Sequence, residues 1–280
     1  MEGRKLSGGA HELLGWTLYE SGPENADHAV LLLPGGLCSA AFYDDLLAEP
    51  ELRQQSIRFV ATTLPGHAGT SPPQDVSIES YGRQAAALAA ELGCDAVVGH
   101  SLGANVALEM VLAGGFAGSV VLLSPSFSAE DESKFLPILD RLTIVLGHLP
   151  YVLMLKMTAP MMRRSLPPTR RDPLVAELEK NDPRIIRRLM HGYLEYLHRS
   201  ASLAPRLCDT GVHAWVAFGE HDMVKLADDE RETLENCPHV SLVTIAGAGH
   251  LTLNEKPAEI AELVLAAVTR DSAAGPAPIS

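Results

Sequence analysis

The sequence lacks any long apolar run and any surplus of positive charge, and each absence excludes a class of protein. No stretch of its 280 residues approaches the roughly 18 consecutive apolar residues of a membrane-spanning helix. Its formal net charge is −13, with 22 Lys and Arg against 35 Asp and Glu, whereas nonspecific binding to nucleic acid needs a basic surface. The composition therefore predicts neither a membrane span nor a nucleic-acid partner.

Cysteine is also scarce, with Cys38, Cys94, Cys208 and Cys237 widely spaced and without a CxxC pair or a histidine at metal spacing. We interpret all four as free thiols. The first residues, MEGRKLSGGAHELLGW, hold no apolar core of signal-peptide length, so the expected location is cytoplasmic. Hydrophobic residues make up 46% of the chain, which is enough for a single large core that needs no disulfide bonds or structural metal.

Strand-like and helix-like stretches alternate along most of the chain. Apolar runs bounded by Gly, Pro or polar residues are typical of buried strands, and they occupy residues 28–36, 57–66, 94–101, 119–127, 213–222 and 239–250. Most intervals between them have helical periodicity, as does the segment after the last run: residues 40–55, 77–93, 104–115, 227–237 and 254–271. In residues 11–22 apolar and polar side chains alternate, which is typical of an antiparallel edge strand. This order predicts a mostly parallel sheet covered by helices on both faces.

The alternation stops once, between residues 127 and 205, where only helical segments separated by prolines occur. We therefore expect a core formed by residues 1–126 and 206–280, and a helical cap formed by residues 127–205. The cap holds 12 of the basic residues against nine acidic ones. We interpret these charges as solvent-exposed helix faces, and attraction of an anionic substrate to the cap remains an alternative. Met154 and Met157 have helix-face spacing typical of packing, and they remain candidates for the apolar lining of a substrate pocket.

A serine stands between glycines where a strand gives way to a helix, in Gly99-His100-Ser101-Leu102-Gly103. A sharp turn of this kind lifts the middle side chain above the edge of the sheet, and the glycines avoid collisions that a Cβ would make. Ser101 is therefore the candidate nucleophile.

A serine hydroxyl needs a histidine to take its proton and an acid to orient that histidine. His250 follows one predicted strand and Asp222 follows another, so both should reach the same sheet edge as Ser101. Glu220 is the reserve candidate for the acid. His100 and His67 are more typical of structural residues, although either can line the site.

Backbone N–H groups are the expected donors to an oxyanion. The glycine turn after the first core strand supplies Gly36, with Leu37 as the alternative, and Leu102 follows the nucleophile. The candidate lining residues are Leu37, His100, Met154 and Met157.

Taken together, these motifs resemble those of the α/β-hydrolase superfamily, as does the stretch LPGHAGTSPP, which is similar to the family's Pro-Gly-His-Gly-x-Ser loop. The resemblance implies an α/β fold, with an eight-stranded, mostly parallel sheet flanked by helices and an inserted helical cap. Two departures are Pro34, where many members carry a histidine, and Thr63, where an aspartate is frequent. The resemblance implies no metal and no organic cofactor.

The predicted function is hydrolysis of carboxylic esters through an acyl-serine, with a small to medium, mainly apolar acyl group and a small-molecule substrate as partner. A serine at position 101 does not match the haloalkane dehalogenase and epoxide hydrolase branches of the superfamily, because their nucleophile is an aspartate. An acyltransferase, a C–C bond hydrolase and a ligand sensor that carries a triad remain alternatives. The sequence predicts no oligomeric state.

Overall fold

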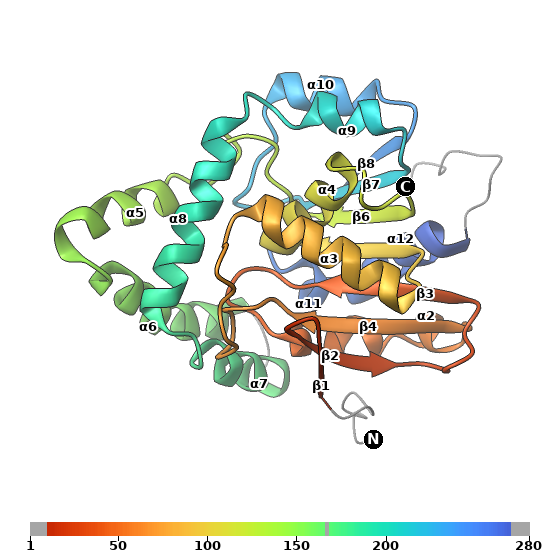
Figure 1. Ribbon diagram of the computed structural model, residues 1–280, viewed down its shortest axis with the longest axis horizontal. Helices are drawn as coiled ribbons and strands as arrows, with labels where there is room; N and C mark the ends of the chain where they lie inside the picture. Colours follow the sequence, from red (N-terminus) through yellow and green to blue (C-terminus); the bar gives the residue numbers. More distant parts are fainter. Residues whose placement is uncertain (1–9, 166–167, 270–280) are drawn as a thin grey trace.

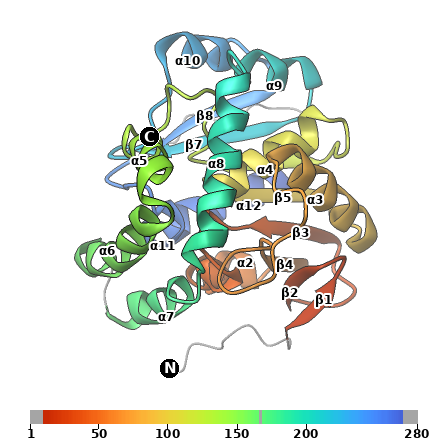
Figure 2. The same cartoon turned by 60° about the vertical axis from the view of Figure 1, so that its left-hand side comes forward.

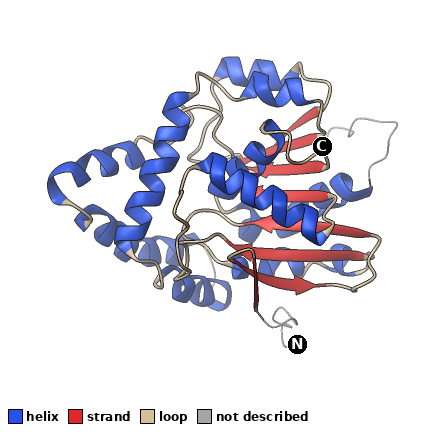
Figure 3. Cartoon of the chain, in the orientation of Figure 1, coloured by secondary structure: helices blue, strands red, loops and turns tan. Residues whose placement is uncertain are grey.

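A computed structural model of the chain describes residues 10–165 and 168–269, and a single eight-stranded sheet forms its centre (Figures 1 and 3). The strand order is β1-β2-β4-β3-β5-β6-β7-β8. The pairs β1–β2 and β2–β4 are antiparallel, and every other neighbouring pair is parallel. The strands are β1 (His11–Leu13), β2 (Trp16–Ser21), β3 (His28–Leu33), β4 (Ile57–Thr63), β5 (Ala96–His100), β6 (Ser119–Leu123), β7 (Ala214–Gly219) and β8 (Val240–Ile245). The predicted fold class is confirmed.

Helices bury both faces of this sheet. Along β3, Leu31 and Leu33 join one apolar cluster while Val30 and Leu32 join the other, as the two-residue period of a strand requires. The first cluster includes residues of α3 (Ile78–Leu92), α4 (Leu102–Leu112), α9 (Ala204–Thr210) and α10 (Asp228–Glu235). The second includes residues of α1 (Asp44–Leu47), α2 (Pro50–Arg53), α11 (Thr252–Glu255) and α12 (Pro257–Thr269).

Two segments differ from their predicted form. The single edge strand expected over residues 11–22 is a hairpin of β1 and β2, turned by Leu14 and Gly15 with φ of 53° and 82°. The helix expected over residues 40–55 is broken into the 3₁₀ turn η1 (Ala40–Tyr43), α1 and α2. Pro50 begins α2 with its fixed φ and cannot continue the preceding helix, which accounts for one break.

Between β6 and β7 the described chain contains helices and no strand. The first four are α5 (Phe135–Leu146), α6 (Leu149–Ser165), α7 (Pro168–Leu178) and α8 (Pro183–Arg199), and we refer to these four and the described residues that join them as the insertion; the fifth is α9, which packs on the core. Figures 1 and 2 show α8 alongside the sheet, with α5 and α6 farther out. The insertion lies beyond the edge where β3 and β5 end, because Asn181 donates a hydrogen bond from Nδ2 to the Leu37 carbonyl at 2.8 Å.

No helix in the described ranges combines the length and the apolar character that crossing a membrane would require.

Candidate active site

Ser101 occupies the sharp turn between β5 and α4. Its backbone has φ 50° and ψ −118°, a conformation that L-residues rarely adopt. A Cβ on Gly103 would collide with the carbonyl oxygen of Leu33, and one on Gly99 would lie 2.6 Å from the Cα of Ala104. The two glycines therefore let strand, helix and nucleophile turn approach one another closely.

Asp222 and His250 come together at the same edge of the sheet. His250 Nδ1 lies 2.8 Å from Asp222 Oδ1, although 28 residues separate the two along the chain. The other carboxylate oxygen, Oδ2, accepts a hydrogen bond from the Ser124 hydroxyl at 2.5 Å. Val224 N–H also donates to Oδ1, at 3.0 Å. These partners hold the carboxylate in one orientation and direct it at the imidazole.

The surroundings of Asp222 favour its ionised form. Burial pushes the pKa of this carboxyl upward, but the hydrogen bond and charge of His250, together with the bonds from Ser124 and Val224, bring it below the usual value. Glu220 is placed differently, because its carboxylate accepts a hydrogen bond from Gly247 N–H at 2.8 Å on an exposed turn. Of the two candidate acids, Asp222 is the one that contacts His250.

Two backbone N–H groups near the nucleophile have no acceptor among the described residues, those of Gly36 and Leu102. They are neighbours, since a Cβ built on Gly36 would lie 3.8 Å from the Cβ of Leu102. Leu37, the alternative donor, already donates its N–H to His67 Nδ1 at 2.9 Å. The geometry therefore leaves Gly36 and Leu102 free to bind an anion and Leu37 occupied.

His67 is a structural acceptor whose role the sequence did not indicate. It is completely buried, and burial lowers the pKa of its imidazole to about 4, so the ring is neutral at pH 7 and Nδ1 can accept the Leu37 proton. Asn181 completes the arrangement, because its Oδ1 accepts from Ala68 N–H at 2.9 Å while its Nδ2 donates to the Leu37 carbonyl. The peptide groups on both sides of Leu37 are thus fixed by side chains.

His100 supports the loop that carries His250. Its Nε2 lies 2.8 Å from the His250 carbonyl oxygen, and its ring centroid is 5.0 Å from the centroids of both Phe42 and His250. Burial lowers the pKa of His100 to about 3, and the nearby His250 adds to this effect. A neutral ring donates this bond from Nε2, and its place beneath His250 makes His100 a supporting residue.

A cavity of about 130 Å³ opens between the core and the insertion, beside the turn that carries Gly36 and Leu37, which we call the oxyanion turn after the role expected from the sequence. Leu37 lines it, as do Phe42, Thr158, Leu174, Leu178 and Leu251. Of the methionines proposed from the sequence, Met154 packs partly buried against the core and Met157 is half exposed, and neither lines this cavity. Met190 of α8 lies close to this turn, with its Cε 3.4 Å from a Cβ built on Gly36.

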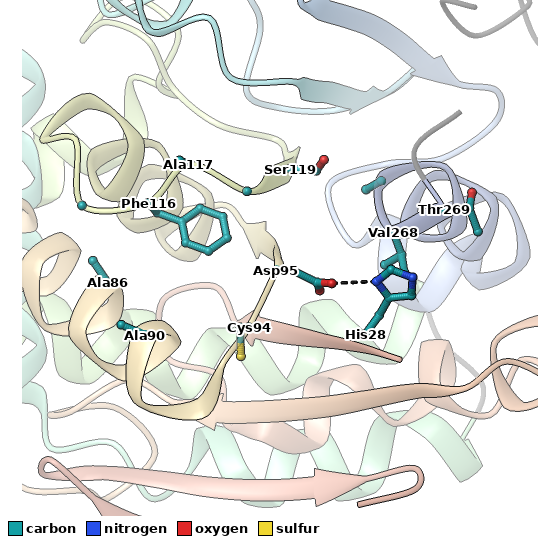
Figure 4. Close-up of a pocket in the computed structure, with 13 residues that line it drawn as sticks. His28, Ala86, Ala90, Cys94, Asp95, Phe116, Ala117, Ser119, Val268 and Thr269 are labelled. Atoms are coloured by element: carbon teal, nitrogen blue, oxygen red, sulfur yellow. Dashed lines mark hydrogen bonds and ion pairs between the residues drawn. The ribbon is translucent and has the colours of Figure 1, made fainter. Parts of the chain in front are cut away.

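A larger cavity, of about 500 Å³, lies at the opposite edge of the sheet (Figure 4). Its lining includes His28 at the start of β3 and Asp95 just before β5, which share a hydrogen bond of 2.6 Å. Small residues such as Ala86, Ala90 and Gly118 form much of the rest. Because it lies at the amino ends of the strands, it is remote from Ser101 and is not the candidate site.

No group of three or more His, Cys, Asp or Glu side chains in the described ranges has an arrangement that could hold a metal ion.

The sequence pattern of the alpha/beta hydrolase family matches residues 30–263. No match was found among curated proteins. Solved structures similar in fold include a hydrolase from Pseudomonas aeruginosa PA01, 18% identical with a TM-score of 0.72, over 93% of this chain and 98% of that one. A thermophilic esterase from Thermogutta terrifontis is 16% identical with a TM-score of 0.67, covering 89% and 91%. The N-acyl homoserine lactonase AidH, an E219G mutant complexed with N-hexanoyl homoserine, is 20% identical with a TM-score of 0.67, covering 92% and 97%.

Proposed function

The chain belongs to the alpha/beta hydrolase family, and from that premise we propose that it hydrolyses carboxylic esters through an acyl intermediate on Ser101. The observation that carries the proposal is the Asp222–His250 pair at the sheet edge where Ser101 turns, beside the unpartnered amides of Gly36 and Leu102. Nucleophile, base, orienting acid and anion donors are the groups that acyl transfer through serine requires.

The Asp222 carboxylate sets the direction of proton transfer. It accepts the Nδ1 proton of His250, which fixes the tautomer whose Nε2 is free to accept a proton. His250 then takes the Ser101 proton as the serine oxygen attacks the substrate carbonyl. When the tetrahedral intermediate collapses, the same proton passes to the departing alcohol. Water attacks the acyl-serine by the reverse sequence and releases the acid.

The Gly36 and Leu102 amides would bind the negatively charged oxygen of the tetrahedral intermediate. Donors that are already in place need no reorganisation as this charge develops, and losing one costs about 2.7–4 kcal/mol of transition-state stabilisation in other enzymes. His67 and Asn181 hold the peptide groups on both sides of Leu37, and this would keep the adjoining Gly36 amide directed at the site.

The acyl group would occupy the cavity of about 130 Å³ beside the oxyanion turn. Leu37, Leu174, Leu178 and Leu251 give it an apolar wall, and its volume suits a small or medium acyl chain. Thr158 and Leu178 belong to α6 and α7. We propose that the insertion acts as a cap and forms the roof of this acyl pocket.

Steady-state hydrolysis of p-nitrophenyl esters from acetate to palmitate, by wild type and Ser101→Ala side by side, tests this function. We expect many turnovers per protein, a maximum at short or medium chain length, and a fall in kcat on the order of 10⁴-fold in the variant. Retention of most activity in Ser101→Ala would contradict the assignment of the nucleophile.

The same assay separates the alternatives. An added alcohol that diverts the acyl group from water at low concentration would indicate an acyltransferase. A single burst equal to the protein concentration would indicate a ligand sensor. No ester turnover, together with cleavage of a carbon–carbon bond next to a carbonyl in a parallel assay, would indicate a C–C bond hydrolase.

The cytoplasm is the proposed compartment. All four cysteines lie in the described residues and are unpaired, which is the usual state of thiols in a reducing environment.

A further inference from the structure

The outer end of the insertion exposes an apolar surface that nothing in the described chain covers. Helices α5 and α6 form a hairpin turned by Gly147, with φ 61°. Around that turn Ile144 is 83% and Val145 is 85% exposed, the two highest values among the exposed large hydrophobic side chains of the described residues. We call this surface the apolar tip, and it consists of Leu142, Ile144, Val145, Leu146, Leu149 and Leu153.

The apolar tip lies at the part of the molecule farthest from the sheet in Figures 1 and 2. Helix α5 buries Leu139 and Thr143 but exposes the side chains at and after its last turn. A contiguous set of exposed aliphatic side chains is costly in water and marks a surface that binds an apolar partner.

The charges around the tip indicate what kind of partner fits. Near the tip on α5 and α6 the charged side chains are Arg141 and Lys156, both exposed, and one acid, Asp140. Asp140 is half-buried and accepts a hydrogen bond from His191 Nδ1 at 2.9 Å. The tip is thus locally basic on a chain whose net charge is −13. Two copies joined through it would bring like charges together, whereas an anionic lipid surface would complement both the cations and the aliphatic side chains.

Part of the tip extends along one face of α6. Leu149, Leu153 and Met157 are spaced four residues apart on this helix, so they share one face, and all three are exposed. Thr158, which lines the cavity of about 130 Å³, lies about 100° around the helix from Met157 and therefore belongs to a different face. The exposed face of α6 thus widens the apolar surface and is separate from the cavity lining.

We propose that the apolar tip docks the protein on the surface of an anionic lipid bilayer, with the aliphatic side chains inserted among the acyl chains and Arg141 and Lys156 among the headgroups. This binding does not depend on the proposed esterase activity. It would concentrate the protein where apolar substrates partition.

The test is cosedimentation of the full chain with vesicles of equal parts phosphatidylglycerol and phosphatidylcholine, and with vesicles of phosphatidylcholine alone. Wild type should bind the anionic vesicles more tightly, and binding should weaken as salt rises. Val145→Glu should weaken binding at least about tenfold, because it places a carboxylate where insertion is required. Arg141→Gln should weaken binding to anionic vesicles more than to neutral ones.

The matched control is Leu14→Glu, which adds the same charge at a leucine 57% exposed in the β1–β2 turn. Figure 2 shows β1 and β2 on the opposite side of the molecule from α5 and α6. This control should bind vesicles nearly as wild type does, and both variants should unfold at the wild-type temperature. Equal binding by Val145→Glu and wild type, or no binding by wild type, would overturn the proposal. A wild-type dimer that Val145→Glu dissociates, with no vesicle binding, would show instead that the tip joins two copies of the chain.

Discussion

Ser101, Asp222 and His250 could be selected from the sequence because their residue types and their places after predicted strands carry the signal. Ser124 carries no such signal. It is one serine among many, and its contact with Asp222, 98 positions away, depends on a left-handed backbone with φ 53° just after β6. His67 is similar, because its bond to Leu37 depends on how two loops approach. Residues that act through a reactive group are visible only once the chain is folded.

At the residue scale, Asp222→Asn should fold normally and lose activity by about 10⁴-fold, because the amide would favour the wrong tautomer of His250. Glu220→Gln is the matched control, since Glu220 bonds to Gly247 on the surface. Steady-state kinetics on one p-nitrophenyl ester compares the two variants. A larger loss in Glu220→Gln than in Asp222→Asn would assign the acid to Glu220.

Ser124→Ala removes one of the hydrogen bonds that Asp222 accepts and leaves the His250 contact in place. A hydrogen bond to a charged group contributes about 1.5–3 kcal/mol, so kcat/KM should fall roughly 10- to 100-fold. Ser126→Ala is the control, because that nearby hydroxyl donates to Glu132. If the two variants behave alike, Ser124 does not act through Asp222.

At the scale of elements, three segments of the chain meet at the oxyanion turn and hold it through hydrogen bonds. The turn after β3 presents Leu37, the loop after β4 presents His67, and the chain just before α8 presents Asn181. Sequence periodicity predicted α3 over residues 77–93, and the helix spans Ile78–Leu92, with Ser77 as its cap and Gly93 at φ 65°. Periodicity could not predict the hairpin of β1 and β2, because β1 is only three residues long and its turn depends on Leu14 adopting a positive φ.

His67→Ala leaves the Leu37 N–H without an acceptor, which should loosen the oxyanion turn. Because the oxyanion is absent from the bound substrate and develops in the transition state leading to the tetrahedral intermediate, kcat should fall by about tenfold or more while KM changes little. His67→Asn should restore much of the lost rate, since its side-chain oxygen can take the place of Nδ1. If kcat/KM instead falls in both variants because KM rises while kcat is unchanged, His67 shapes the substrate pocket.

At the scale of the whole molecule, the alternation of strands and helices is enough to predict the fold, because apolar runs and amphipathic helices have distinct periods. The packing of the insertion on the core is not predictable in the same way. It depends on contacts such as that between Asn181 and Leu37, 144 residues apart, and on the few side chains that α6 and α7 present to the cavity.

Buried histidines should make the folded molecule sensitive to acid. The pKa of His67 is about 4 when folded and about 6.5 when unfolded, so between these values the unfolded chain binds more protons and stability falls as pH falls. From pH 7 to 4.5 this group alone costs roughly 2–3 kcal/mol. Glu230 acts in the opposite sense, because burial raises its pKa to about 7. The melting temperatures of wild type and His67→Asn should therefore be measured between pH 7 and 4.5. We expect the melting temperature of wild type to fall more steeply with falling pH, and equal slopes would contradict the assignment of this acid sensitivity to His67.

Covalent labelling of Ser101 tests the proposed mechanism most directly. Wild type would be treated with a p-nitrophenyl alkylphosphonate, and the released p-nitrophenol and the modified peptide would be measured. The mechanism predicts one p-nitrophenol per protein, a phosphonyl group on Ser101, loss of ester hydrolysis in step with labelling, and much slower labelling of Asp222→Asn. Full hydrolytic activity with Ser101 phosphonylated, or inactivation with the label on another residue, would contradict it.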